Sequence, residues 1–195
     1  MKRTAEAEAA EIKHFALTLE NPEAAGAGRS RLYSLMLAEH RRLDEFLAKA
    51  SSDGAVADEA AYQGFRERLL RHIRIEEKLL LPMAKRNRDG APLPLAERLR
   101  LDHGALGALL MLVPLDYTFR AIRAVLDRHN PLEENEGGVY QQCASLAGPE
   151  IDSLLAQISA TPRVAPSQWV NSNRVVAAAK RVLARAGYDP ALLGP

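Results

Sequence analysis

One pattern occurs twice in this 195-residue chain and constrains its fold more than any other: a histidine followed four and five residues later by glutamates. The two copies span residues 72–77 and 129–134. On an α-helix, residues four apart lie one turn apart on the same face. Two such helices facing each other would bring two imidazoles and two carboxylates to one point. The repeat therefore predicts a cluster of metal-ligand side chains inside a helical protein.

The composition is that of a globular protein with an aliphatic, helical core. Apolar residues make up 47% of the chain and charged residues 26%, a balance that differs from that of a disordered chain. Aromatic residues make up only 5%, while alanine, leucine, glutamate and arginine, all good helix formers, dominate. We therefore expect helices that pack through aliphatic side chains.

Charge and cysteine content exclude several classes of protein. A formal net charge of +1 gives no electrostatic basis for binding nucleic acid or an anionic membrane. The single cysteine, Cys143, excludes a disulfide framework or a cysteine-based zinc site within one chain, and it fits a reducing compartment. The acidic start is unlike a secretory signal, and the longest weakly polar run, residues 104–115, is too short to span a membrane. We expect a cytoplasmic protein without nucleic-acid or membrane partners.

Apolar residues spaced three and four apart predict four long amphipathic helices, at about residues 30–50, 57–87, 95–112 and from 115 onward. The connections between these helices are short. Long helices with short connections favour an all-α fold, an up-down-up-down four-helix bundle with extra N- and C-terminal helical segments.

The second predicted helix shows the periodicity most clearly. Its inward stripe consists of Phe65, Leu69, His72, Glu76, Leu79 and Met83. Arg66 falls beside this stripe and is expected to point to solvent. Pro82 is expected to kink or end the helix, because a proline removes one backbone hydrogen bond and clashes with the preceding turn.

The bundle is expected to span residues 29–160. Residues 1–28 have the features of an N-terminal extension or linker, including Gly28, so Ser30 is the expected N-cap of the first helix. Residues 161–195 are expected to form a linker and a C-terminal helix. Docking of this helix on the bundle is the default expectation, and contact with a protein partner is the alternative.

Four of the five histidines fall one to a helix on the apolar stripes, and two of them have a glutamate in phase. A lone histidine on such a stripe is usually a hydrogen-bonded core residue, but four desolvated histidines would each need a partner. A shared metal centre satisfies all of them at once, and we prefer it to the alternative of a metal-free polar core. The candidate metal ligands are His40, His72, Glu76, His103, His129 and Glu133.

The ligand types narrow the choice of metal. Imidazoles and carboxylates without thiolate suit iron, manganese or zinc. Six protein ligands exceed the four that a tetrahedral zinc ion uses, whereas two divalent ions can share them through bridging carboxylates. A carboxylate-bridged centre of two iron ions fits best, with other divalent metals as alternatives. The pattern differs from that of ferritin-like proteins, in which glutamate precedes histidine by three residues.

Pro131 lies inside the second copy of the repeat and disturbs its phase. Either the helix kinks there, or it stops near Arg128 and restarts with Asn130 as its cap. The first copy, around His72, is unbroken and is therefore the firmer half of the predicted site.

Residues 30–147 resemble the hemerythrin-like HHE cation-binding domains. The resemblance is carried by residues 38–43 with His40, residues 72–82 with Pro82 at their end, residues 101–103 with His103, and residues 129–134. It implies the hemerythrin-like bundle. It also implies that the six candidate residues ligate two iron ions, with Glu76 and Glu133 bridging them.

One departure from this family concerns the third helix. Oxygen-carrying hemerythrins place two histidines four residues apart there, whereas Leu99 and Gly107 flank His103 at that spacing. One iron ion would then have fewer protein ligands than in the carriers. This favours reactivity, sensing or iron binding over reversible oxygen transport.

A second departure follows the fourth-helix motif. Where the family usually has an aromatic residue followed by proline, this chain has Gly138 and Val139, and Tyr140 comes two residues late. This leaves Glu134 and Glu136 as alternatives to Glu133 for the second carboxylate ligand.

Three functions are compatible with these features. The first is a non-enzymatic di-iron protein that binds or senses oxygen, nitric oxide or iron. The second is an enzyme that uses the same centre on peroxide or nitric oxide, for which the sequence offers no separate acid, base or substrate pocket. The third is a metal-free helical adaptor that uses the basic C-terminal helix as its contact surface. The oligomeric state stays open.

Overall fold

The computed structural model describes residues 22–51 and 58–194. Within these ranges the chain is helical and contains no strand, so the predicted all-α class is confirmed. The elements are α2 (Pro22–Ala50), α3 (Glu59–Ile75), the π-helical turn η1 (Glu76–Leu80), α4 (Leu81–Arg86), α5 (Ala96–Leu109), α6 (Asp116–Glu134), α7 (Val139–Ala147), the 3-10 turn η2 (Gly148–Glu150), α8 (Ile151–Ala160), α9 (Asn173–Arg185) and the 3-10 turn η3 (Pro190–Leu193).

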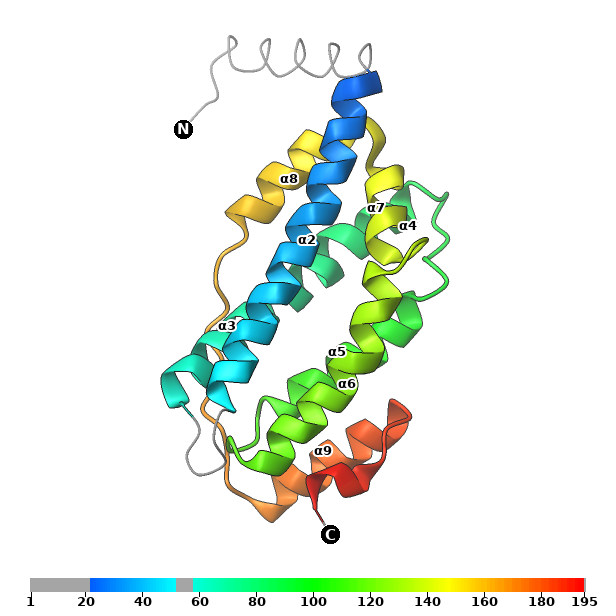
Figure 1. Cartoon of the computed structure of the whole chain (residues 1–195). Helices are drawn as coiled ribbons and strands as arrows, with labels where there is room; N and C mark the ends of the chain where they lie inside the picture. The colour runs from blue at the N-terminus through cyan, green and yellow to red at the C-terminus, as the bar shows by residue number, and fades with distance from the viewer. Residues whose placement is uncertain (1–21, 52–57, 195) are drawn as a thin grey trace, which may run out of the picture.

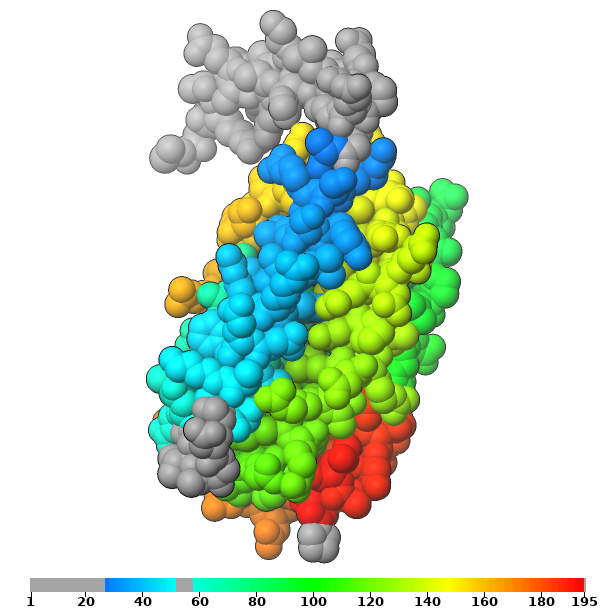
Figure 2. Space-filling model, viewed as in Figure 1, coloured from blue at the N-terminus to red at the C-terminus, as the bar shows by residue number. Residues whose placement is uncertain are grey.

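The helices pack as pairs that follow one another along the chain. α2 lies against α3, and α5 lies against α6, as Figure 1 shows. α7 packs on α2, α4 and α6, while α8 returns to α2. α9 docks on α5, and η3 docks on α6, so the C-terminal segment covers one end of that pair (red in Figure 2). Within the described ranges, no helix has the length and apolar character that a membrane crossing requires.

The first helix begins earlier than the sequence predicts. α2 starts at Pro22 and not at Ser30, because proline is well suited to the first turn of a helix, where its missing N–H is not needed. Gly28 lies within this helix, where a Cβ atom would lie 2.8 Å from Cγ2 of Ile151. The absence of a side chain at Gly28 therefore permits close packing of α2 on α8. Residues 1–21 of the predicted extension lie outside the described ranges.

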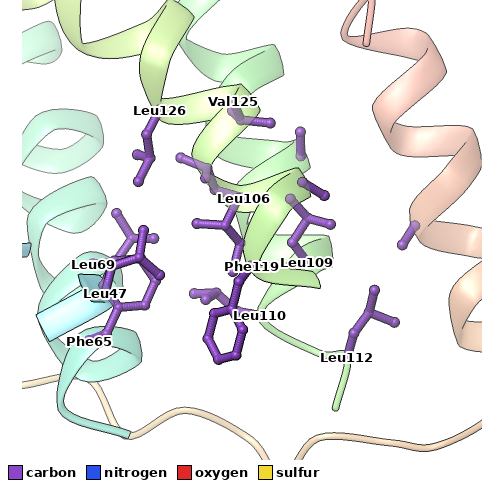
Figure 3. Close-up of a cluster of buried hydrophobic side chains, with 14 of the residues drawn as sticks. Leu47, Phe65, Leu69, Leu106, Leu109, Leu110, Leu112, Phe119, Val125 and Leu126 are labelled. Atoms are coloured by element: carbon purple, nitrogen blue, oxygen red, sulfur yellow. The ribbon is translucent and has the colours of Figure 1, made fainter. Parts of the chain in front are cut away.

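The apolar core consists of two clusters along the helix axes. One lies near the C-terminal end of α2 and includes Leu47, Phe65, Leu106 and Phe119 (Figure 3). The other surrounds Met36 and packs α2 against α4, α7 and α8. Between them each ligand-bearing helix has its histidine, so a polar layer separates the two clusters. The packing of both clusters therefore holds the predicted site at its middle.

A π-helical turn interrupts the second long helix at Glu76. α3, η1 and α4 form one continuous helix, so the helix neither ends nor breaks at Pro82. In the π turn the backbone N–H of Leu81 donates to the carbonyl of Glu76, five residues back. This extra residue rotates the following side chains, which is why Leu80 is buried and the predicted Leu79 is only half-buried.

Arg66 is buried, so the prediction that it points to solvent is wrong. Only 2% of its surface is exposed, and its guanidinium donates to the carbonyls of Leu110 and Ser167. The guanidinium also lies 5.2 Å from the ring centre of Trp169. Residues of the segment before α9 cover the side chain, an effect that helical periodicity alone does not reveal. Arg66 thereby ties this segment to α3.

We expect Arg66→Met to lower the free energy of unfolding by about 1–3 kcal/mol, because the apolar stem is kept while the buried carbonyl of Leu110 and the part-buried carbonyl of Ser167 lose their donor. Urea unfolding followed by circular dichroism measures the change. Arg74→Met, at an exposed position of the same helix, is the matched control and should change stability little. Equal stabilities of the two variants would contradict the role of Arg66.

Candidate metal centre

The six candidate ligands predicted from the sequence come together in the polar layer. All six are buried, and they form two groups that share two glutamates. Within each group the ligand atoms lie within 4.8 Å of one another. The first metal position is defined by His40, His72, Glu76 and Glu133, and the second metal position by Glu76, His103, His129 and Glu133.

The two shared glutamates connect the two positions. Glu76 Oε1 lies 3.0 Å from Nε2 of His72, and Glu76 Oε2 lies 3.1 Å from Nε2 of His103. Glu133 Oε2 lies 3.5 Å from Nε2 of His40 and 3.3 Å from Nε2 of His129. Carboxylates placed between two pairs of imidazoles are arranged to bridge two cations.

Helix α6 keeps the second copy of the repeat in phase. It runs through Pro131 to Glu134, so of the two alternatives the stop near Arg128 with a restart at Asn130 is wrong. The continuous helix places Glu133 one turn after His129, facing both metal positions. Of the alternatives considered for the second carboxylate, Glu136 is exposed, and Glu134 contacts the outer nitrogen of a histidine instead.

The second glutamate of each repeat holds a histidine of another helix. Nδ1 of His103 donates to Glu77 Oε1 over 2.8 Å, and Nδ1 of His40 donates to Glu134. A carboxylate on Nδ1 fixes the ring and leaves the Nε2 lone pair for a metal ion. In both repeats the first glutamate thus faces the metal positions, and the second orients an imidazole.

The outer nitrogen of His129 faces a different network, which includes the C-terminal segment. Its Nδ1 lies 3.5 Å from Oδ2 of Asp102, which is fully buried on α5. The same carboxylate accepts hydrogen bonds from Arg98 and, over 2.7 Å, from the hydroxyl of Tyr188. Residues that follow α9 therefore help to position a candidate metal ligand, a role that the sequence did not suggest.

Tyr140 lies among the ligand atoms of the first metal position. Its hydroxyl oxygen is 2.6 Å from Glu76 Oε1 and 2.9 Å from Glu133 Oε2. It is 2.9 Å from Nε2 of His40 and 3.1 Å from Nε2 of His72. In the sequence this tyrosine is notable only for its late position, and helical periodicity does not predict its place in the site.

A tight turn brings Tyr140 into this position. Gly137 has a φ of 73°, in the left-handed region that favours glycine. A Cβ atom on Gly138 would lie 2.6 Å from the backbone oxygen of Glu133. The glycine pair therefore lets the chain fold back against the end of α6, so that the first turn of α7 presents Tyr140.

The shared carboxylates carry charge into the core. Burial opposes the ionisation of Glu76, but His72 and His103 outweigh it and hold the pKa of this carboxyl well below its usual range. Burial would lower the pKa of His103, yet the carboxylates of Glu76 and Glu77 raise that pKa to about 9. At His129 the charge of Glu133 likewise outweighs burial, and the pKa of this histidine rises to about 10. The centre therefore attracts cations, whether protons or metal ions.

Several buried atoms of the centre make no well-aligned hydrogen bond to any described residue. They are Glu76 Oε2, His103 Nε2 and Glu133 Oε1, together with the outer ring nitrogens, Nδ1, of His72 and His129. Buried polar atoms are nearly always satisfied, so the two carboxylate oxygens and Nε2 of His103 fit a metal ion as their partner. A set of imidazoles and carboxylates without thiolate suits iron, manganese or zinc.

Comparison with known proteins identifies one family. The sequence model described as the hemerythrin HHE cation binding domain matches residues 31–137. The match contains all six candidate ligands and ends before Tyr140. No curated protein and no solved structure matches the chain.

We expect Asp102→Asn to weaken metal binding at the second position by about 10–100-fold, because a neutral amide orients His129 less strongly than a carboxylate. Anaerobic titration with Fe(II) or Mn(II) against a competing chelator measures the affinity. The control is Asp116→Asn, at an exposed position near the start of α6. Affinities equal to that of the unaltered protein would rule out the positioning role of Asp102.

Proposed function

Since the chain belongs to the family of hemerythrin HHE cation-binding domains, we propose that it is a non-haem di-iron protein. Its centre would bind or sense oxygen, nitric oxide or iron itself. The observation that carries the proposal is the position of Glu76, whose two oxygens face the imidazoles of His72 and His103 at 3.0 and 3.1 Å. Because each oxygen of Glu76 faces a different histidine, the carboxylate is placed to bind two ions, one through each oxygen.

The proposed ligand roles follow from the two metal positions. His40 and His72 would hold one iron ion, and His103 and His129 the other, each through Nε2. Glu76 and Glu133 would bridge the two ions. Iron held in this way supplies one-electron redox chemistry and open coordination positions for small ligands. The carboxylates on Nδ1 keep His40 and His103 in the tautomer that binds metal.

The finer architecture is part of the same proposal. We infer that the four ligand-bearing helices form the up-down-up-down bundle of the family, over the predicted residues 29–160 with the first turns of α2 added from Pro22. A bundle of this kind brings one histidine from each helix to a common layer. The single cysteine, Cys143, supports a cytoplasmic location.

The adaptor function has less support than the di-iron function. α9 turns Ala179 and Leu183 toward the bundle, where both are buried. Its apolar side is therefore used within the chain and is not free to receive a partner helix. The enzyme alternative would use the same iron centre, and only turnover of peroxide or nitric oxide that is lost in His72→Ala would favour it.

Protein prepared aerobically from iron-rich medium should contain about two iron ions per chain, one for each metal position. Its visible absorption should change on reduction with dithionite, because the proposed centre is redox-active. Metal analysis together with oxidised and reduced spectra measures both properties. Protein that contains no iron after such preparation would refute the di-iron function.

Removal of the metal should lower stability, because a ligand that binds only the folded state adds to its free energy of unfolding. At a metal concentration about 100 times the dissociation constant, this contribution is ~2.7 kcal/mol. The melting temperature of the metal-replete protein should therefore fall on chelation. In His72→Ala the shift on chelation should be smaller, and an equal shift would contradict the role of His72.

A further inference from the structure

We propose that Tyr140 is a seventh protein ligand, whose phenol oxygen binds the iron ion of the first metal position. This role rests on the proposed di-iron function and adds to it a residue that lies outside the family match, which ends at residue 137. The phenol oxygen contacts both histidines of the first position, and among the described residues no hydrogen bond joins a tyrosine to His103 or His129.

The distances to Tyr140 are those between neighbouring corners of a coordination shell. With metal–ligand bonds of about 2.1 Å, adjacent ligands in an octahedral shell lie ~3.0 Å apart. The phenol oxygen lies 2.6–3.1 Å from the four ligand atoms of the first position. The phenol oxygen therefore occupies the position expected of a fifth ligand, adjacent to the other four.

The four ligand atoms of the first metal position form a ring, and the distances between neighbouring atoms of this ring are of the same order. Nε2 of His40 and Nε2 of His72 are 2.9 Å apart, and Nε2 of His72 and Oε1 of Glu76 are 3.0 Å apart. Nε2 of His40 and Oε2 of Glu133 are 3.5 Å apart. If the four atoms instead surrounded the phenol oxygen as a tetrahedron, each about 2.9 Å from it, they would lie ~4.7 Å from one another. The phenol oxygen thus caps one side of the ring and leaves its centre to the metal ion.

Hydrogen bonding alone does not satisfy this arrangement. Glu134 accepts the Nδ1 hydrogen of His40, so the neutral ring turns the lone pair of Nε2 toward the phenol oxygen. Glu76 and Glu133 offer two carboxylate oxygens as well. When His40 and His72 are neutral, the phenol has one proton to donate, so these electron-rich atoms face one another with too few hydrogens between them. A cation in the centre of the ring satisfies them all.

The backbone fixes the phenol in this place. Tyr140 is fully buried, and the turn at Gly137 and Gly138 holds the start of α7 against the end of α6. On binding, an oxygen–iron bond replaces the phenol O–H bond, and the proton passes to solvent without any change in oxidation state. The first metal position then has five protein ligands and the second has four. Exchangeable small ligands would consequently find more open positions at the second ion.

The test is resonance Raman and visible absorption spectroscopy of the full-length, aerobically oxidised iron protein. A phenolate bound to iron(III) produces a visible charge-transfer band whose excitation enhances tyrosine ring vibrations. We expect these features in the unaltered protein, with the vibrations shifted when the protein carries ring-deuterated tyrosine. In Tyr140→Phe the features should disappear while about two iron ions per chain remain, because the six other ligands are intact.

The matched control is Tyr33→Phe. The hydroxyl of Tyr33 donates to the backbone oxygen of Glu134 over 2.7 Å and does not face the ligand atoms, so this variant should keep the band. A protein with two iron ions and no tyrosine vibrations would overturn the ligand role and leave the di-iron function intact. A protein without iron would overturn both. The isotope shift in the unaltered protein shows whether any tyrosine binds iron, so its absence would overturn the ligand role even if Tyr140→Phe does not fold.

Discussion

The structure depends on two carboxylates, those of Glu76 and Glu133, that are buried between the apolar clusters of a helical protein. Burial of an ionised carboxylate costs several kcal/mol unless charge and hydrogen bonds compensate for it. The four histidines that surround these carboxylates supply nitrogen atoms, and the spacing of the two pairs fits one cation in each group. The polar layer and the cations that we propose for it would therefore stabilise each other.

In this arrangement the repeated motif has two roles, ligation and the orientation of another ligand. Its histidine and first glutamate face the metal positions, whereas the second glutamate reaches the Nδ1 of a histidine on another helix. Each copy thereby provides ligands and also orients a ligand of the other helix pair. At His129 the corresponding carboxylate is Asp102, which is held in turn by the C-terminal Tyr188. The segment after the family match is therefore part of the support of the centre.

Helical periodicity predicted the positions of the main helices and the convergence of six polar residues, because both follow from the spacing of side chains on a regular helix. It misplaced Leu79 because the π turn adds one residue to the helical period at Glu76. It missed the burial of Arg66 and the role of Tyr188, because both depend on a distant segment that folds back over the bundle. Tyr140 was missed because its position comes from a glycine turn that no helical pattern describes.

The central claim is that the polar layer holds two metal ions, and anomalous X-ray diffraction at the iron absorption edge tests it most directly. In crystals of the iron-loaded protein we expect two peaks about 3.5–4 Å apart, with Glu76 and Glu133 between them. One peak should lie among Nε2 of His40, Nε2 of His72 and the phenol oxygen of Tyr140, and the other between His103 and His129. A single peak, or peaks elsewhere in the molecule, would contradict the account.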